Sequence, residues 1–323
     1  MNKHALNALT ALGLASLLVL SFLVMNFVSA YTSNSSLTAN VNVGNVIYLS
    51  VSPNAIYFPG LYPGQSYDTN SLDVVTDNDI GGNIAANALV EGTNWAGPSS
   101  ANMLVSNTVW APTAGVAGTQ LTNTLTNTNI LIPQPSLANP STGNFIYFGI
   151  TIPGGTPPGN YVQTIYFENE NLSTPATYNS PSTSNSVLAT ANVLGICYIS
   201  LAPSSINFGS VYASANVPTN MLVTDSDPNG NVAASLLVAG THWALTSNTQ
   251  ITFGVSNTLW YSSSLPTYTG NALTNTLAIT GITIAAPTQT SPTTNSPIYF
   301  GLGVPGGTPA GSYSQTITIE NSC

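Results

Sequence analysis

The chain has 323 residues, of which 43% are hydrophobic and only 3% are charged. Its single Lys or Arg residue is Lys3, against ten Asp and Glu residues, so the basic side chains that neutralise phosphates are missing and nucleic acid is excluded as a partner. A chain this hydrophobic is expected to fold, because disorder requires low hydrophobicity together with high charge.

Residues 1–30 have the pattern of an export signal. Lys3 precedes a long apolar run that ends at Val28, and Val28-Ser29-Ala30 fits a signal-peptidase site. We expect cleavage after Ala30 and a protein secreted to the extracellular cell surface. The apolar run is also long enough to cross a bilayer, which takes about 20 residues. An uncleaved segment would anchor the protein, and membrane contact is expected only through it.

A strand is predicted shortly after the signal. Residues 37–43 alternate apolar and polar side chains with the two-residue period of a β-strand, and residues 187–193 occupy the equivalent place before a second repeat. One interpretation is that the first of these strands is donated to a neighbouring subunit, whose pockets would receive its apolar side chains, Leu37, Ala39, Val41 and Val43. The alternative is that the strand folds back on its own domain.

The remainder of the chain is a duplication. Four segments recur in the same order: Ile47–Pro53 as Cys197–Pro203, Gly92–Trp95 as Gly240–Trp243, Val105–Trp110 as Val255–Trp260, and Gln163–Asn169 as Gln315–Asn321. Residues 173–186 are rich in Ser, Thr, Pro and Asn, which is typical of a linker. We therefore expect one domain over residues 31–172 and a second over residues 187–323.

Each repeat has the pattern of an all-β domain. The apolar runs are short, rich in Val, Ile, Tyr, Phe and Thr, and separated by Gly, Pro, Asn and Asp. In the first repeat about seven strands are predicted, near 46–51, 72–76, 86–91, 103–109, 125–132, 145–152 and 161–168. Seven strands are expected of an immunoglobulin-like sandwich, so the predicted fold is two tandem immunoglobulin-like Greek-key β-sandwich domains.

Several motifs strengthen this reading: Ser50–Pro53 followed by Phe58, Pro63-Gly64, Val74–Thr76, Gly92–Trp95, and the closing run Val304–Tyr313. With them the chain resembles the immunoglobulin-like modules of archaeal and bacterial cell-surface proteins. The resemblance covers both repeats. It implies a secreted sandwich used in surface layers, threads or stalks, and it brings no catalytic residues with it. One departure is that Ala213-Ser214 replaces Pro63-Gly64 in the second repeat, which leaves the shape of that loop in doubt.

One acidic turn is a candidate calcium site. Asp225, Asp227 and Asn229, followed by Gly230, fit the opening of a calcium loop, in which alternate oxygen ligands converge on a hard cation. The loop's bidentate Glu is absent, since Leu236 stands in its place. The alternative is a tight polar turn between two strands. Calcium is the only cofactor that the sequence suggests.

Four Trp residues fall at paired places in the repeats: Trp95 with Trp243, and Trp110 with Trp260. Their retention in both copies favours packing in the core, where an indole buries a large area. An aromatic platform for sugars is the alternative. His242 is the only His after His4 and has Asn94 as its counterpart, so it is a poor candidate for a catalytic base. We predict that the protein is not an enzyme.

Two further features concern export. Asn34 and Asn171 begin N-glycosylation sequons in predicted loop or linker positions. Cys197 and Cys323 are the only cysteines, and in an oxidising compartment they could pair. Cys197 stands where the first repeat has Ile47, so a buried unpaired cysteine is the alternative.

Together these features predict a non-catalytic structural protein of the cell surface, a subunit of an extracellular coat, thread or filament. Its main partner would be other copies of itself. The alternative is an adhesin or glycan-binding module, with surface glycans as partners. Growth of an ordered polymer would favour the first reading, and a strong glycan hit would favour the second.

Overall fold

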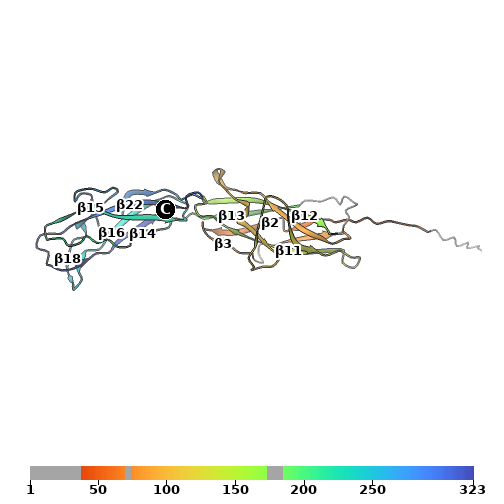
Figure 1. The fold of residues 1–323 in the computed structure, drawn as a ribbon, viewed down its shortest axis with the longest axis horizontal. Coiled ribbons are helices and arrows are strands. Elements are labelled where there is room, and N and C mark those ends of the chain that lie inside the picture. The colour runs from red at the N-terminus through yellow and green to blue at the C-terminus, as the bar shows by residue number, and fades with distance from the viewer. Residues whose placement is uncertain (1–37, 70–73, 173–184) are drawn as a thin grey trace, which may run out of the picture. The chain divides into compact units, whose positions relative to one another are not determined.

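The computed structural model describes residues 38–69, 74–172 and 185–323 (Figure 1). These residues form two all-β sandwiches with separate hydrophobic cores, which confirms the predicted immunoglobulin-like fold. The predicted signal, Asn34 and Leu37 lie outside the described residues. Within the described ranges, no helix has the length and apolar content needed to cross a membrane.

A strand of the first sandwich overlaps each predicted strand region, although residues 105–107 of the predicted strand 103–109 form a 3₁₀ turn, and several short strands are added. Its elements are β1 (Ser50–Ser52), β2 (Ala55–Leu61), β3 (Ser66–Tyr67), β4 (Val74–Ile80), β5 (Ala86–Gly92), β6 (Trp95–Ala96), η1 (Pro98–Ser100), β7 (Asn102–Met103), η2 (Val105–Asn107), β8 (Thr108–Ala111), β9 (Thr119–Gln120), β10 (Thr126–Ile132), β11 (Ser141–Thr151), β12 (Gly159–Asn171) and β13 (Asn185–Val193).

Two sheets make up this sandwich. One has the order β1-β4-β11-β8-β9, with β3 also paired to β11, and the other has the order β10-β5-β12-β13-β2, with β6 paired to β12 and β7 paired to β6. Side chains alternate between core and solvent, as in β5, whose burial switches at every residue. The sheets meet through contacts such as Phe148 against Phe167, whose ring centroids are 6.1 Å apart. The core therefore lies between two pleated faces, as expected of a sandwich.

The second sandwich repeats this plan with fewer paired strands. Its elements are β14 (Ser200–Ala202), β15 (Asn216–Pro228), β16 (Ala234–Gly240), β17 (Trp243–Leu245), β18 (Asn248–Phe253), η3 (Val255–Asn257), β19 (Thr258–Tyr261), β20 (Asn271–Ala272), β21 (Ala278–Ile284), β22 (Thr293–Gly303), β23 (Tyr313–Ser314) and β24 (Ile317–Ser322). One sheet has the order β14-β15-β22-β19-β20, and two three-stranded sheets have the orders β21-β16-β24 and β18-β17-β23.

The loop whose shape the sequence left in doubt is the same in both sandwiches. Gly64 has φ 82° and Ser214 has φ 67°, so both lie in the left-handed region. The backbone N–H of Gly64 donates to the carbonyl of Ile152, and that of Ser214 donates to the carbonyl of Val304. Ser thus adopts a conformation that Gly takes more easily, because the surrounding backbone bonds are retained.

Candidate functional site

The strand β13 completes the first sandwich, although it follows residues 173–184, which the structure does not describe. It pairs antiparallel with β12, from Gly159 opposite Val193 to Phe167 opposite Asn185, and parallel with β2 (Figure 1). Its inward side chains are all buried: Val187, Ala189, Ala191 and Val193. The segment before the second repeat is therefore a strand of the first sandwich, where it closes the gap between β2 and β12.

The same place in the second sandwich has no strand. Residues 205–211, which correspond to β2, are not in a strand, and the counterpart of β12 is divided into β23 and β24. Ile56 is 4% exposed and Phe58 is fully buried in the first sandwich, whereas their counterparts Ile206 and Phe208 are partly exposed. The side chains that β13 covers in one repeat are thus open in the other.

The opening is a groove, formed by two adjoining cavities of about 590 and 390 Å³. Both cavities are lined by Ile206, Phe208, Trp243 and Tyr313, so they lie side by side. The larger continues along residues 209–213, and the smaller continues along residues 314–317. We call this feature the open groove of the second sandwich.

Aromatic rings form the floor of the open groove. The centroid of Trp243 lies 6.0 Å from that of Phe208 and 5.6 Å from that of Phe253, and Phe253 lies 5.2 Å from Tyr313. The residues that line the groove carry no Asp, Glu, Lys, Arg or His. Such a site recognises apolar side chains and backbone hydrogen-bonding groups, because it has no charge with which to bind an ion.

The segment that precedes the first sandwich is exposed. Residues 38–43 form no strand, and Val41 and Val43 are 88% and 72% exposed. These are two of the four side chains that the sequence predicts for strand donation. Their apolar surface is therefore available to another segment.

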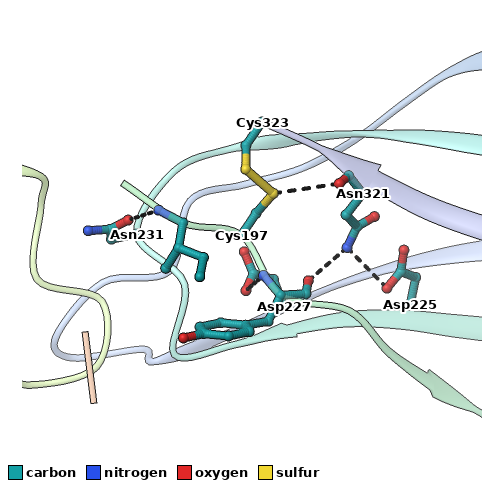
Figure 2. The surroundings of a disulfide bond; sticks show 8 residues. Cys197, Asp225, Asp227, Asn231, Asn321 and Cys323 are labelled. Atoms are coloured by element: carbon teal, nitrogen blue, oxygen red, sulfur yellow. Dashed lines mark hydrogen bonds between the residues drawn. A yellow bond between two sulfur atoms is a disulfide. The ribbon is translucent and has the colours of Figure 1, made fainter. Parts of the chain in front are cut away.

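The candidate calcium residues have other partners. Asp225 and Asp227, on β15, are fully buried. Asn321 donates to Asp225 Oδ1 over 3.3 Å, and the backbone N–H of Tyr198 donates to Asp227 Oδ1 over 2.8 Å (Figure 2). Asn229 has φ 64° and occupies the turn that follows. In the ranges that the structure describes, no group of three or more His, Cys, Asp and Glu residues could hold a metal ion.

Burial changes the acid–base behaviour of these carboxyls. Loss of water raises the pKa of Asp225 to about 6; the hydrogen bond from Asn321 opposes this shift, and the charge of Asp227 adds to it. In the first sandwich, burial likewise raises the pKa of Asp77 to about 7. Burial also raises the pKa values of Asp79 and Asp227. The polar-turn interpretation accounts for these contacts, and calcium binding stays a prediction.

The four Trp residues pack inward. Trp95 is fully buried, and Trp110, Trp243 and Trp260 are 6–8% exposed. The indole N–H of Trp95 donates to Thr108 and that of Trp243 donates to Thr258, each over 2.9 Å. Packing in the core is therefore the main role of the indoles, and Trp243 also lines the open groove.

His242 has a structural contact. Its Nδ1 accepts from the backbone N–H of Val255, and Asn94 Oδ1 accepts from Val105 in the first sandwich. His242 thus replaces Asn94 as an acceptor at the start of a short 3₁₀ turn.

The two cysteines are joined. Cys197 and Cys323 form a disulfide with Cα atoms 6.1 Å apart, beside Asn321 and the buried carboxylates (Figure 2). It connects the end of β24 to the segment before β14. A disulfide fits an oxidising compartment outside the cytoplasm. Of the two sequon residues, Asn171 is the partly exposed last residue of β12, and Asn34 lies outside the described residues.

Sequence reasoning did not find the groove residues. Four of them are identical to their counterparts in the first repeat, so the sequence pattern predicts that they are buried in the core: Ile206, Phe208, Tyr313 and Ile317. The signal that could have found them is the position of residues 187–193. A strand that precedes a repeat and follows a linker can belong to the repeat before it.

Comparisons with known proteins give structural matches only. No protein-family model and no curated protein sequence matches the chain. The CsuC–CsuE chaperone–tip adhesion subunit complex of Acinetobacter baumannii matches with a TM-score of 0.42 and 12% identity, over 85% of this chain and 100% of that chain. The adhesive subunit CfaE of Escherichia coli matches with a TM-score of 0.28 and 11% identity, over 88% and 84%. The CupB6 tip adhesin of Pseudomonas aeruginosa matches with a TM-score of 0.26 and 11% identity, over 85% and 95%. At these values the matches carry nothing about the function of this chain.

Proposed function

We propose that this protein is a non-catalytic structural subunit that self-associates into an extracellular coat, thread or filament on the cell surface. The observation that carries the proposal is the open groove of the second sandwich, at the place where the first sandwich has β13. An immunoglobulin-like sandwich that lacks one strand is completed by polypeptide from elsewhere, because backbone groups at a sheet edge and apolar pockets together bind an extended segment.

The composition supports an assembly of this kind. After Lys3 the chain has no Lys or Arg, so ion pairs between subunits cannot set their affinity. Apolar side chains and backbone hydrogen bonds need no charge. The disulfide and the export signal that the sequence predicts both fit a place outside the cytoplasm.

Electron microscopy of the purified protein beginning at Tyr31 tests the proposal. We expect ordered filaments or sheets whose repeat equals one subunit, formed without other components. A protein that stays monomeric at high concentration, together with a native cell surface on which it forms no array, would contradict the proposal.

Adhesion is the second candidate function. The observation on this chain that favours it is the aromatic floor of the open groove, with Tyr212 86% exposed at its margin. A glycan array tests adhesion. Strong binding that is lost in a Tyr212→Ala variant would favour it over assembly, and an array without hits would leave assembly as the function.

A further inference from the structure

We infer that the open groove of the second sandwich receives residues 37–43 of another copy of this chain, which enter it as the missing strand. This inference rests on the proposed function, since it names the contact by which subunits assemble. The partner is a second copy, and the contact joins the N-terminal segment of one copy to the second sandwich of the next.

The first argument is that the occupant of the equivalent place has the same pattern. Residues 37–43 read LTANVNV and residues 187–193 read VLATANV. Three positions are identical: Ala39 with Ala189, Asn42 with Asn192, and Val43 with Val193. The four residues that β13 buries all correspond to apolar residues in the N-terminal segment, so the same face would be covered.

The second argument is that the register can be transferred. In the first sandwich Ala191 lies opposite Tyr161 on β12 and beside Phe58 on β2. The counterparts of those two residues are Tyr313 and Phe208, and both line the open groove. Val41 corresponds to Ala191 and is therefore assigned to the pocket between Tyr313 and Phe208. It is larger than Ala191 by two methyl groups, which suits a pocket that is open.

The third argument excludes the first sandwich of the same copy. The place that the N-terminal segment would take there is already filled by β13, whose inward side chains are at most 2% exposed. Folding back on its own domain, the alternative left open by the sequence, would require β13 to leave. The N-terminal segment therefore has exposed apolar side chains, Val41 and Val43, and the open groove has an apolar surface that could cover them.

The geometry of this contact gives a linear polymer. The donated segment and the groove are different surfaces, so the contact is heterologous and propagates from copy to copy unless a ring closes. Each added copy presents a new free groove or a new free segment. A thread or filament is the expected product of this propagation.

A matched pair of substitutions tests the inward face. Val41→Asp places a carboxylate in the apolar pocket, whereas Asn42→Asp places the same group on the outward face, where its counterpart Asn192 is partly exposed. Both residues lie in the N-terminal segment, so neither change alters the core of a sandwich. We expect Val41→Asp to reduce sedimenting polymer at pH 7 at least 10-fold and Asn42→Asp to change it less than 2-fold. Equal polymer from both variants would overturn the inference.

Cross-linking tests the register. Leu188 lies opposite Thr164 in the first sandwich, so Thr38 of one copy should lie opposite Thr316 of the next. A Thr38→Cys protein mixed with a Thr316→Cys protein should give a covalent dimer on mild oxidation. The shifted pair Thr38→Cys with Ser314→Cys should give less than a tenth as much, and Asn40→Cys with Ser314→Cys should restore it. Cross-linking that does not depend on this spacing would overturn the assigned register.

A peptide separates this inference from the proposed function. A protein that lacks residues 31–44 should bind a synthetic peptide of residues 37–44 at one per chain, and should not bind the same peptide with Val41→Asp. If the full protein forms filaments but the peptide does not bind and Val41→Asp still polymerises, the inference fails and the proposed function stands. If the peptide binds in register but the full protein never assembles, the proposed function fails and the groove assignment stands.

Discussion

In this protein, hydrogen bonds between uncharged side chains connect different strands, where many other proteins have ion pairs. Thr108 accepts from Trp95 and donates to Gln163 Oε1 over 2.8 Å, and Gln163 Nε2 donates to the carbonyl of Thr93. The second sandwich repeats the network through Thr258, Gln315 and Thr241. Each of these groups has a hydrogen-bond partner without a charge, which suits a chain that contains no Lys or Arg after Lys3.

The buried carboxylates predict that the protein is more stable in acid than at neutral pH. The pKa of Asp225 is raised to about 6 in the folded state, above the ordinary value of 3.8, so the folded state retains a proton that the unfolded chain releases. This contribution to stability is full below about pH 4 and is lost as pH rises through about 6. At about 1.4 kcal/mol per pKa unit, the shift sets an upper limit of about 3 kcal/mol on this contribution.

Asp225→Asn measures that contribution. The amide keeps an acceptor for Asn321 and carries no charge, so the free energy of unfolding at pH 7 should rise by up to about 3 kcal/mol relative to wild type, while the two should agree near pH 4. Denaturant unfolding at both pH values gives the numbers. Glu320→Gln is the control, because Glu320 is exposed on β24. A pH profile that is the same for wild type and Asp225→Asn would contradict the assignment.

At the scale of the elements, the two repeats are completed in different ways. The first has β13, which lies between β12 and β2, and the second has a disulfide at the end of β24. Cys197 and Cys323 correspond to Ile47 and Asn171, so the first sandwich has no such bridge. The disulfide holds the end of β24 in place, in a sandwich where the position equivalent to β13 is empty.

Removal of the disulfide should therefore loosen the second sandwich alone. The bridge spans 126 residues, and a loop of that length lowers the entropy of the unfolded chain by the equivalent of about 4–5 kcal/mol. In a Cys197→Ala, Cys323→Ala double variant we expect faster hydrogen exchange in β24 and β16. Mass spectrometry of peptic fragments measures this, and β5 and β12 of the first sandwich are the internal control. Unchanged exchange in β24 would contradict the prediction.

The strands could be predicted from the sequence, but the sandwich to which β13 belongs could not. The alternation of apolar residues located strands throughout the first repeat, because one face of each is buried and the other is solvated. The same alternation located a strand near residues 187–193. It did not say that β13 belongs to the first sandwich, since the period of a strand contains no information about its neighbours. The open groove was hidden for the same reason: its residues match core residues of the other repeat.

At the scale of the whole molecule, the chain after Lys3 carries ten acidic side chains and no Lys or Arg. Four of the ten acidic residues are fully buried, at Asp77, Asp79, Asp225 and Asp227, so fewer remain to keep copies apart in solution. Opposite charges that salt could screen are absent from the chain after Lys3, apart from His242 when it is protonated and the terminal amine. Repulsion between copies is therefore set by the carboxylates.

The last prediction is that lateral association of the assembled protein depends on pH more than on salt. Near pH 3 most exposed carboxylates are protonated, since their ordinary pKa lies near 4, so filaments should bundle and sediment; at pH 7 the net negative charge should keep them apart. A change from about 0.05 to 0.5 M salt at pH 7 should have a smaller effect, because it screens repulsion without removing the charge. Analytical sedimentation and electron microscopy at each condition measure both. The Val41→Asp protein is the control: by our inference it forms no filaments at pH 7, so any bundles that it gives at pH 3 would show association that needs no strand donation. A response to salt that equals or exceeds the response to pH would contradict the prediction.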